Sequence, residues 1–247
     1  MNETIIAWTD VSWNPTHGCS RVSDGCRHCY AESLSLKRGW TTQSWTANHA
    51  RQNVLLKPHK LNEPRKLKVP SRIFVNSMSD LFHPLIPDDY LHQIWQVMLD
   101  CPQHTFQILT KRPERAAVWA GPWPSHIWMG TSVEDARVMH RIDTIRRCAA
   151  RVRFLSCEPL LGPLPGLNLD GINWVIVGGE SGSGYRPMDH AWARDIRDAC
   201  LAQGVALFFK QSSAFRTESG TALIHEDGSR WVWHQYPSLL TPPTPAV

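Results

Sequence analysis

The chain has 247 residues, of which 42% are apolar and 19% are charged, and its net charge is +4. These values exclude a disordered chain, a collagen-like repeat and a coiled coil, and they allow one large domain with a single core. The mildly basic balance permits a polyanionic partner without requiring one. The sequence contains no signal peptide and no apolar stretch of about eighteen residues, so we expect a cytoplasmic protein with no membrane partner.

Short apolar runs recur at intervals of roughly twenty to thirty residues, which is typical of strands that alternate with helices. We predict strands at residues 73–75, 106–109, 127–129, 152–155, 174–177 and 205–209, and residues 5–8 are a candidate first strand. The runs are continuous rather than alternating, as in a parallel sheet that is buried on both faces. Helices are expected from near Tyr30, Pro87, Asp135 and Asp189.

This alternation predicts the α/β class, with a parallel (β/α) barrel, full or partial and TIM-like. We expect residues 1–237 to form one barrel-like domain. Residues 14–30 form a glycine-bearing loop with three cysteines, and residues 38–70 are expected to make an irregular excursion over the rim. Residues 238–247 are rich in proline and predict a disordered tail.

The residues that directly follow the predicted strands are mostly polar or charged. Because the carboxyl ends of parallel strands meet at one rim, where sites in such folds are built, we expect a site there. The residues at these positions are Asn76, Ser77, Ser79, Asp80, Lys111, Glu134, Cys157, Glu158, Gly178, Gly179, Glu180 and Lys210. Helix capping is an alternative explanation for Asp80, but it accounts less well for Lys111 or Glu158.

The cysteines divide into two groups. Cys19, Cys26 and Cys29 lie within eleven residues in the pattern C-x6-C-x2-C, whereas the other four are scattered along the chain. Seven is an odd number and a chain of this size needs no disulfides, so we expect reduced thiols or metal ligands. Clustered soft thiolates favour zinc or an iron–sulfur cluster.

Three readings of this loop stay open. A [4Fe–4S] cluster held by three cysteines keeps one iron free to bind a substrate or cofactor. A structural zinc needs four ligands, so His17 or His28 would have to complete the set. The third reading is three reduced thiols without a metal.

The loop and several blocks of sequence resemble a known family. The segments GCRHCYAE, RFLSCEPLLG and WVIVGGESG resemble a family of phage and bacterial proteins of unknown function that carry this three-cysteine motif. The resemblance runs from about Ile6 to Gln211. More distantly, a three-cysteine loop after the first strand of a parallel β/α barrel is similar to the radical S-adenosylmethionine superfamily.

The superfamily resemblance implies a radical-SAM-like barrel in which Cys19, Cys26 and Cys29 bind a [4Fe–4S] cluster. The open iron would bind S-adenosyl-L-methionine, and an external reductant would start its cleavage. The superfamily usually has the spacing C-x3-C-x2-C, and its Gly-Gly-Glu element follows the second strand. Here two segments are candidates for binding the cofactor: Asn76, Ser77, Ser79 and Asp80 after an early strand, and Gly178, Gly179 and Glu180 after a late one.

Three rim residues are candidates for catalysis. Cys157 is expected to face the rim, where it could donate a hydrogen atom or act as a fourth cluster ligand; its alternative is a buried core position. Glu158 could accept a hydrogen bond from an amine, a ribose or a base edge, and Lys111 could bind phosphate or carboxylate. Tryptophans among the lysines and arginines of residues 38–70 could stack bases. They could equally form an apolar collar that shields the cluster from water and oxygen.

These features lead to one main hypothesis, one alternative and one further interpretation. The main hypothesis is an iron–sulfur enzyme of radical S-adenosylmethionine type that repairs or modifies a base of a nucleic acid, such as DNA, or of a nucleotide. The alternative is a nucleic-acid-binding protein stabilised by zinc or an iron–sulfur cluster, without radical chemistry. An iron–sulfur flavoprotein is a third reading, although the chain has no dinucleotide-binding glycine fingerprint.

Overall fold

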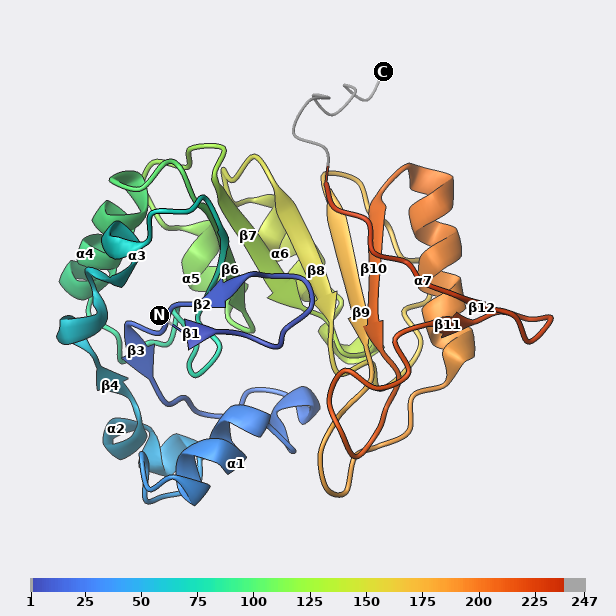
Figure 1. The fold of residues 1–247 in the computed structure, drawn as a ribbon, viewed down its shortest axis with the longest axis horizontal. Helices are drawn as coiled ribbons and strands as arrows, with labels where there is room; N and C mark the ends of the chain where they lie inside the picture. Colours follow the sequence, from blue (N-terminus) through green and yellow to red (C-terminus); the bar gives the residue numbers. More distant parts are fainter. Residues whose placement is uncertain (1, 238–247) are drawn as a thin grey trace.

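The computed structural model describes residues 2–237 and contains one large sheet with helices around it (Figure 1). Seven strands run parallel in the order β2-β5-β6-β7-β8-β9-β10, and β1 pairs antiparallel with β2 at one edge. The strands are β1 (Asn2–Glu3), β2 (Val11–Ser12), β5 (Arg72–Val75), β6 (Thr105–Thr110), β7 (Ile127–Ser132), β8 (Arg153–Cys157), β9 (Trp174–Gly178) and β10 (Ala206–Gln211). The sheet curls into a half-barrel (Figure 1). Of the two predicted forms, a full or a partial parallel barrel, the partial one is confirmed.

Four helices lie outside the curved sheet: α4 (Asp88–Leu99), α5 (Pro113–Ala117), α6 (His140–Arg146) and α7 (His190–Gln203). The ends of α7 show why the sequence folds this way. The Asp189 carboxylate accepts a hydrogen bond from the backbone amide of Ala191 at 2.8 Å, and Gly204 ends the helix with φ +66°. These are the N-cap and the left-handed C-terminal glycine that helices prefer.

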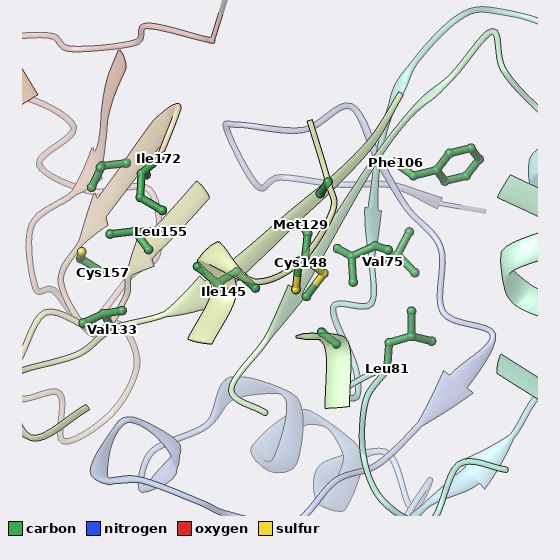
Figure 2. Packing of buried hydrophobic residues seen from close by; sticks show 14 of the residues in the cluster. Val75, Leu81, Phe106, Met129, Val133, Ile145, Cys148, Leu155, Cys157 and Ile172 are labelled. Carbon is green, nitrogen blue, oxygen red and sulfur yellow. The ribbon is translucent and has the colours of Figure 1, made fainter. Parts of the chain in front are cut away.

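Side chains of the central strands alternate between two buried clusters. Outward residues such as Ile108, Leu155 and Val175 pack against the helices, and Figure 2 shows part of this layer. Inward residues form a second cluster on the concave face, made of Trp8, Phe74, Trp128, Val152, Phe154, Trp174, Ile176 and Phe208. Both faces of the sheet are therefore apolar, which explains why the strands read as continuous apolar runs.

The predicted first strand at residues 5–8 is wrong. These residues have no strand geometry, and the first parallel strand is β2, a few residues later. Trp8 instead packs against the concave face, with its ring centroid 4.7 Å from Phe74 and 6.2 Å from Trp174. The bulky indole of Trp8 thus fills the interior of the half-barrel. Ile5 is left 73% exposed.

The segment that covers residues 38–71 and leads into β5 contains only short elements. They are η2 (Ala47–His49), α2 (Ala50–Asn53), β4 (Leu55–Leu56), η3 (Pro58–Lys60) and α3 (Glu63–Lys66). β4 pairs antiparallel with β3 (Thr16–His17), which joins this segment to the start of the three-cysteine loop. Helix α1 (Tyr30–Lys37) begins one residue after Cys29, as predicted, and lies beyond the carboxyl ends of the strands (Figure 1).

A hairpin of β11 (Leu223–Ile224) and β12 (Arg230–Trp231) follows the sheet, and Leu223 packs into the outer cluster. The proline-rich residues 238–247, for which we predict a tail, lie outside the described residues. No helix in the described part of the chain is long and apolar enough to cross a membrane.

Candidate functional site

A cavity of about 360 Å³ lies at the carboxyl ends of the parallel strands. Its floor is the concave apolar layer, represented by Trp8, Phe74 and Leu109, and its upper wall is polar. The predicted site residues that line it are Cys19, Cys26, Cys29, Asn76, Ser77, Ser79, Asp80, Lys111, Glu158, Gly179, Glu180 and Lys210. The structure therefore brings together residues from one end of the chain to the other, as the rim hypothesis requires.

Cys157 does not lie in this cavity. Side chains alternate along β8, so Ser156 and Glu158 line the cavity while Cys157 points into the outer cluster, where it is fully buried (Figure 2). Burial also raises the pKa of its thiol well above the usual value. The expectation that Cys157 faces the rim is wrong, because a residue on that parity of the strand faces the helices.

Gly178 and Gly179 have a packing reason to be glycine. A Cβ atom on Gly178 would lie 2.7 Å from Glu158 Oε1, and one on Gly179 would lie 2.2 Å from the backbone nitrogen of Ser213. The second distance involves backbone and leaves no room for any side chain. Gly179 thus lets the segment after β10 approach the end of β9, whereas Gly178 leaves room for the Glu158 side chain. Only Gly179 lines the cavity.

The three-cysteine loop is attached to the ends of β5 and β6. The Gly18 amide donates to the Met78 carbonyl at 2.9 Å, and the Tyr30 hydroxyl donates to the Ser77 carbonyl at 2.7 Å. Arg112, just after β6, donates to the Ser20 carbonyl at 2.7 Å. Gly18 has φ +79°, and a Cβ there would stand 1.8 Å from the Asn53 carbonyl oxygen, so this position requires glycine.

Other residues of the loop reach the far side of the cavity. Ser23 Oγ donates to the Glu134 carboxylate at 2.9 Å, beyond the end of β7. His28 Nδ1 lies 3.0 Å from Glu180 Oε2, beyond the end of β9. The loop is therefore held across the mouth of the half-barrel by contacts at both sides.

The three thiols are free and partly exposed, and they face the same cavity. Burial raises the pKa of Cys19 to about 12 and also raises that of Cys29, so both thiols are protonated at neutral pH when no metal is bound. Arg112 Nη1 donates to Cys19 Sγ at 3.3 Å, a contact that would strengthen with a thiolate. Among residues 2–237, no three His, Cys, Asp or Glu side chains stand close enough together to hold a metal ion.

The two histidines of the loop have partners other than the thiols. His17 Nε2 lies 2.9 Å from Ser35 Oγ, and burial lowers its pKa to about 4. His28 is engaged with Glu180. In this arrangement neither histidine is placed to complete a Cys₃His zinc site.

A buried charge network stands behind the cysteine loop. Glu134 is 1% exposed and binds Lys111 at 2.8 Å and Arg141 at 3.0 Å. Burial alone would raise the pKa of Glu134, but the two cations hold it below its usual value. Lys111 therefore points to Glu134 as well as to the cavity, and its charge is balanced within the protein. Arg141 was not among the predicted site residues, because it lies in α6, a helix with an apolar stripe.

Glu158 is fixed from two sides. Lys210 Nζ lies 3.1 Å from Glu158 Oε1, and Ser156 Oγ donates to Oε2 at 3.0 Å. All three side chains line the cavity. This arrangement presents an ion pair, rather than a lone carboxylate, to anything that enters.

The two candidate cofactor-binding segments differ in how many of their polar groups are occupied. Asp80 accepts from Thr110 Oγ1 at 2.6 Å and binds Arg112 at 3.1 Å, and Glu180 binds His28 and Arg186. Asn76 is 3% exposed, and its Oδ1 atom has no hydrogen-bond partner in the described part of the chain. The segment after β5 therefore keeps a buried acceptor unused beside the cavity.

The comparisons with known proteins identify a family without assigning a function. No curated protein and no solved structure matches the chain. A family model described as a protein of unknown function, DUF5131, matches residues 3–237, which is nearly the whole chain. The resemblance to a family of unknown function is thereby confirmed, and the chain belongs to the DUF5131 family.

Proposed function

We propose that this chain is an iron–sulfur enzyme of radical S-adenosylmethionine type that acts on a base of a nucleic acid or nucleotide. The observation that carries the proposal is the division of the cysteines. Cys19, Cys26 and Cys29 line one cavity with the polar ends of the strands, whereas the other four are buried in the outer core. Thiols needed only for packing would not be gathered at the mouth of a cavity.

The donor set suits an iron–sulfur cluster. Three soft thiols on one loop leave one iron without a protein ligand, and cations nearby favour the thiolate form that metal binding requires. Arg112 contacts Cys19, and Lys111 stands close enough to favour deprotonation of Cys29. The thiols would draw together on binding, and the loop between Ser20 and His28 contains only one short 3-10 turn, at Asp24–Cys26.

When bound, the cluster with S-adenosylmethionine supplies a 5′-deoxyadenosyl radical after reduction by an external donor. This chain's own residues orient and enclose the reactants. Asn76, with its unused acceptor, and Ser77 would receive the amino group of the methionine part. Glu158 and Lys210 would bind polar edges of the substrate, and the aromatic floor around Trp8 and Phe74 would exclude water beneath a flat ring.

The cofactor assignment has a direct test. After anaerobic reconstitution with iron and sulfide, the protein is reduced with dithionite in the presence of S-adenosylmethionine, and 5′-deoxyadenosine is measured by chromatography. We expect the product from the wild type and none from Cys19→Ala. Cys101→Ala is the matched control, because Cys101 is buried in the core away from the cavity.

Two results bear on the assignment in opposite ways. Product from the wild type and from Cys101→Ala, but not from Cys19→Ala, supports it. A reconstituted protein that carries iron and sulfide, yet forms no 5′-deoxyadenosine and does not retain S-adenosylmethionine in equilibrium dialysis, would overturn the radical chemistry.

The attachment of the loop favours a second candidate, a nucleic-acid-binding protein whose metal is structural. The loop contacts residues beyond β5, β6, β7 and β9, so a metal within it would stiffen the whole mouth. In that case chelation lowers the melting temperature and nucleic-acid binding together, while no 5′-deoxyadenosine forms.

A further inference from the structure

Two segments after β9 and β10 form a flap beside the cavity. Residues 181–187 and 212–218 lie next to each other, joined by a bridge between Ser181 and Ala214 and by a hydrogen bond from the Gly182 amide to the Ala214 carbonyl at 3.1 Å. Ser181 and Thr217 line the cavity. We call these two segments the flap, and it forms one side of the cavity mouth.

The flap exposes aromatic rings beside a cation. Phe215 is 67% exposed and Tyr185 is 39% exposed, although aromatic residues usually bury their rings. Arg216, next to Phe215, is exposed and forms no ion pair within residues 2–237. An exposed ring beside an unpaired arginine is the combination that stacks bases and binds phosphate.

The cysteine loop and α1 carry more unpaired cations. Arg27 lies between Cys26 and His28, both of which line the cavity, and Lys37 and Arg38 end α1. All three are exposed, and none forms an ion pair in the part of the chain that the structure describes.

Acidic groups of the cysteine loop and α1 are already neutralised. Asp24 binds Arg137 at 2.7 Å, and Glu32 binds Arg21 at 2.8 Å. Over residues 21–70 the chain has ten Lys and Arg against three Asp and Glu, a net charge of +7, whereas the whole chain carries only +4. The rest of the chain is thus net acidic, and the excess positive charge lies in the segment that includes α1.

We propose that the mouth between the flap and α1 is a docking site for single-stranded nucleic acid. Arg27 on the cysteine loop and Arg216 on the flap would hold phosphates, and Phe215 and Tyr185 would stack bases, so that one unstacked base enters the cavity. This inference rests on the nucleic-acid part of the proposed function and names the form of the substrate. A duplex keeps its bases stacked and cannot offer them to exposed rings without flipping.

The test measures binding by fluorescence anisotropy with fluorescein-labelled strands of about 15 nucleotides, as DNA and as RNA, and with the matching DNA duplex. We expect the single strands to bind at least about tenfold more tightly than the duplex. Phe215→Ala should weaken single-strand binding about tenfold, in line with the loss of one stacked base. Arg27→Ala with Arg216→Ala should weaken binding and flatten its dependence on salt concentration.

Two variants serve as matched controls. Lys68→Ala removes an exposed cation before the start of β5, at the opposite end of the sheet, and Trp231→Ala removes an aromatic ring that is 58% exposed on β12. Neither should change binding more than twofold. Circular dichroism of each variant checks that the fold is retained.

The outcomes separate this inference from the proposed function. Single-strand binding that is the same with and without reconstituted iron, and that falls in the mouth variants only, supports the site even if no 5′-deoxyadenosine forms. Equal binding of single strand and duplex, displacement by polyglutamate as effective as by oligonucleotide, or no effect of Phe215→Ala would overturn it. Displacement by polyglutamate would indicate an acidic protein partner instead.

Discussion

The two faces of the curved sheet differ although neighbouring residues of the same strands build both. On β8, Leu155 and Cys157 face outward into a dry apolar layer closed by helices, while Phe154 and Ser156 face inward. The inward face is aromatic below and charged above, where the cysteine loop covers it. The comparison indicates that the outer face provides stability and that the polar candidate site is confined to the upper part of the inner face.

The aromatic floor should contribute mainly to the stability of the fold, and Trp174→Ala tests this contribution. Trp174 is fully buried and its ring lies within 6.2 Å of the rings of Trp8 and Phe208. Removing the indole should lower the free energy of unfolding by about 4 kcal/mol, measured by urea denaturation. A loss below about 1 kcal/mol would mean that the floor is loosely packed.

The charged layer should be costly to disturb because it is buried. Glu134→Gln leaves Lys111 and Arg141 without their shared carboxylate and should destabilise the protein by about 3 kcal/mol. Asp24→Asn breaks an ion pair on the same rim that is exposed to solvent, and its effect on the urea midpoint should be far smaller. Equal effects of the two substitutions would show that burial does not make the Glu134 network more important for stability than the exposed ion pair.

Acid should weaken the contact between the cysteine loop and the sheet. His83 lies 2.9 Å from Ser20, and burial and the charge of Arg112 lower its pKa to about 4. The unfolded chain takes up the proton near the ordinary value of 6.5 and the folded chain only near 4. The contribution of neutral His83 to the free energy of unfolding is therefore fully present above pH 6.5. It is lost as the pH falls from 6.5 to 4, by at most about 3 kcal/mol.

His83→Asn should flatten this part of the stability profile, measured as the urea midpoint against pH. The matched control is His59→Asn, because His59 is exposed and has no hydrogen bond or ion pair in the described part of the chain. A profile of His83→Asn that still falls as steeply as that of the wild type would assign the acid sensitivity to other groups.

The smallest expected effect comes from Cys157. Cys157→Ala removes one buried sulfur atom and should lower the free energy of unfolding by about 1 kcal/mol. Because the side chain faces the helices, formation of 5′-deoxyadenosine should be unchanged. Loss of product formation from a stably folded Cys157→Ala would show that this thiol reaches the cavity.

Much of the fold followed from local patterns. Continuous apolar runs marked six of the parallel strands, and capping residues such as Asp189 and Gly204 marked helix ends. The same patterns failed at residues 5–8, since a run containing Ile and Trp reads as a strand whether it pairs with a neighbour or packs as a loop. Only the three-dimensional interior, with room for Trp8, distinguishes the two.

The position of the site was predictable because parallel strands bring their carboxyl ends together. The partners within it were not. Arg112 follows Lys111 and could equally have been an exposed helix start, yet it contacts both Cys19 and Asp80. The prediction put Cys157 on the wrong face of β8, because a strand that is apolar on both faces does not reveal which residues point inward.

We propose that the loop cysteines, and not the four buried cysteines, bind an iron–sulfur cluster. The most direct measurement is the iron and sulfide content of protein purified anaerobically as wild type, Cys29→Ala and Cys157→Ala. We expect roughly four irons and four sulfides per chain in the wild type and in Cys157→Ala, and loss of both in Cys29→Ala. One tightly bound zinc without sulfide, or equal iron and sulfide in Cys29→Ala and the wild type, would contradict the account.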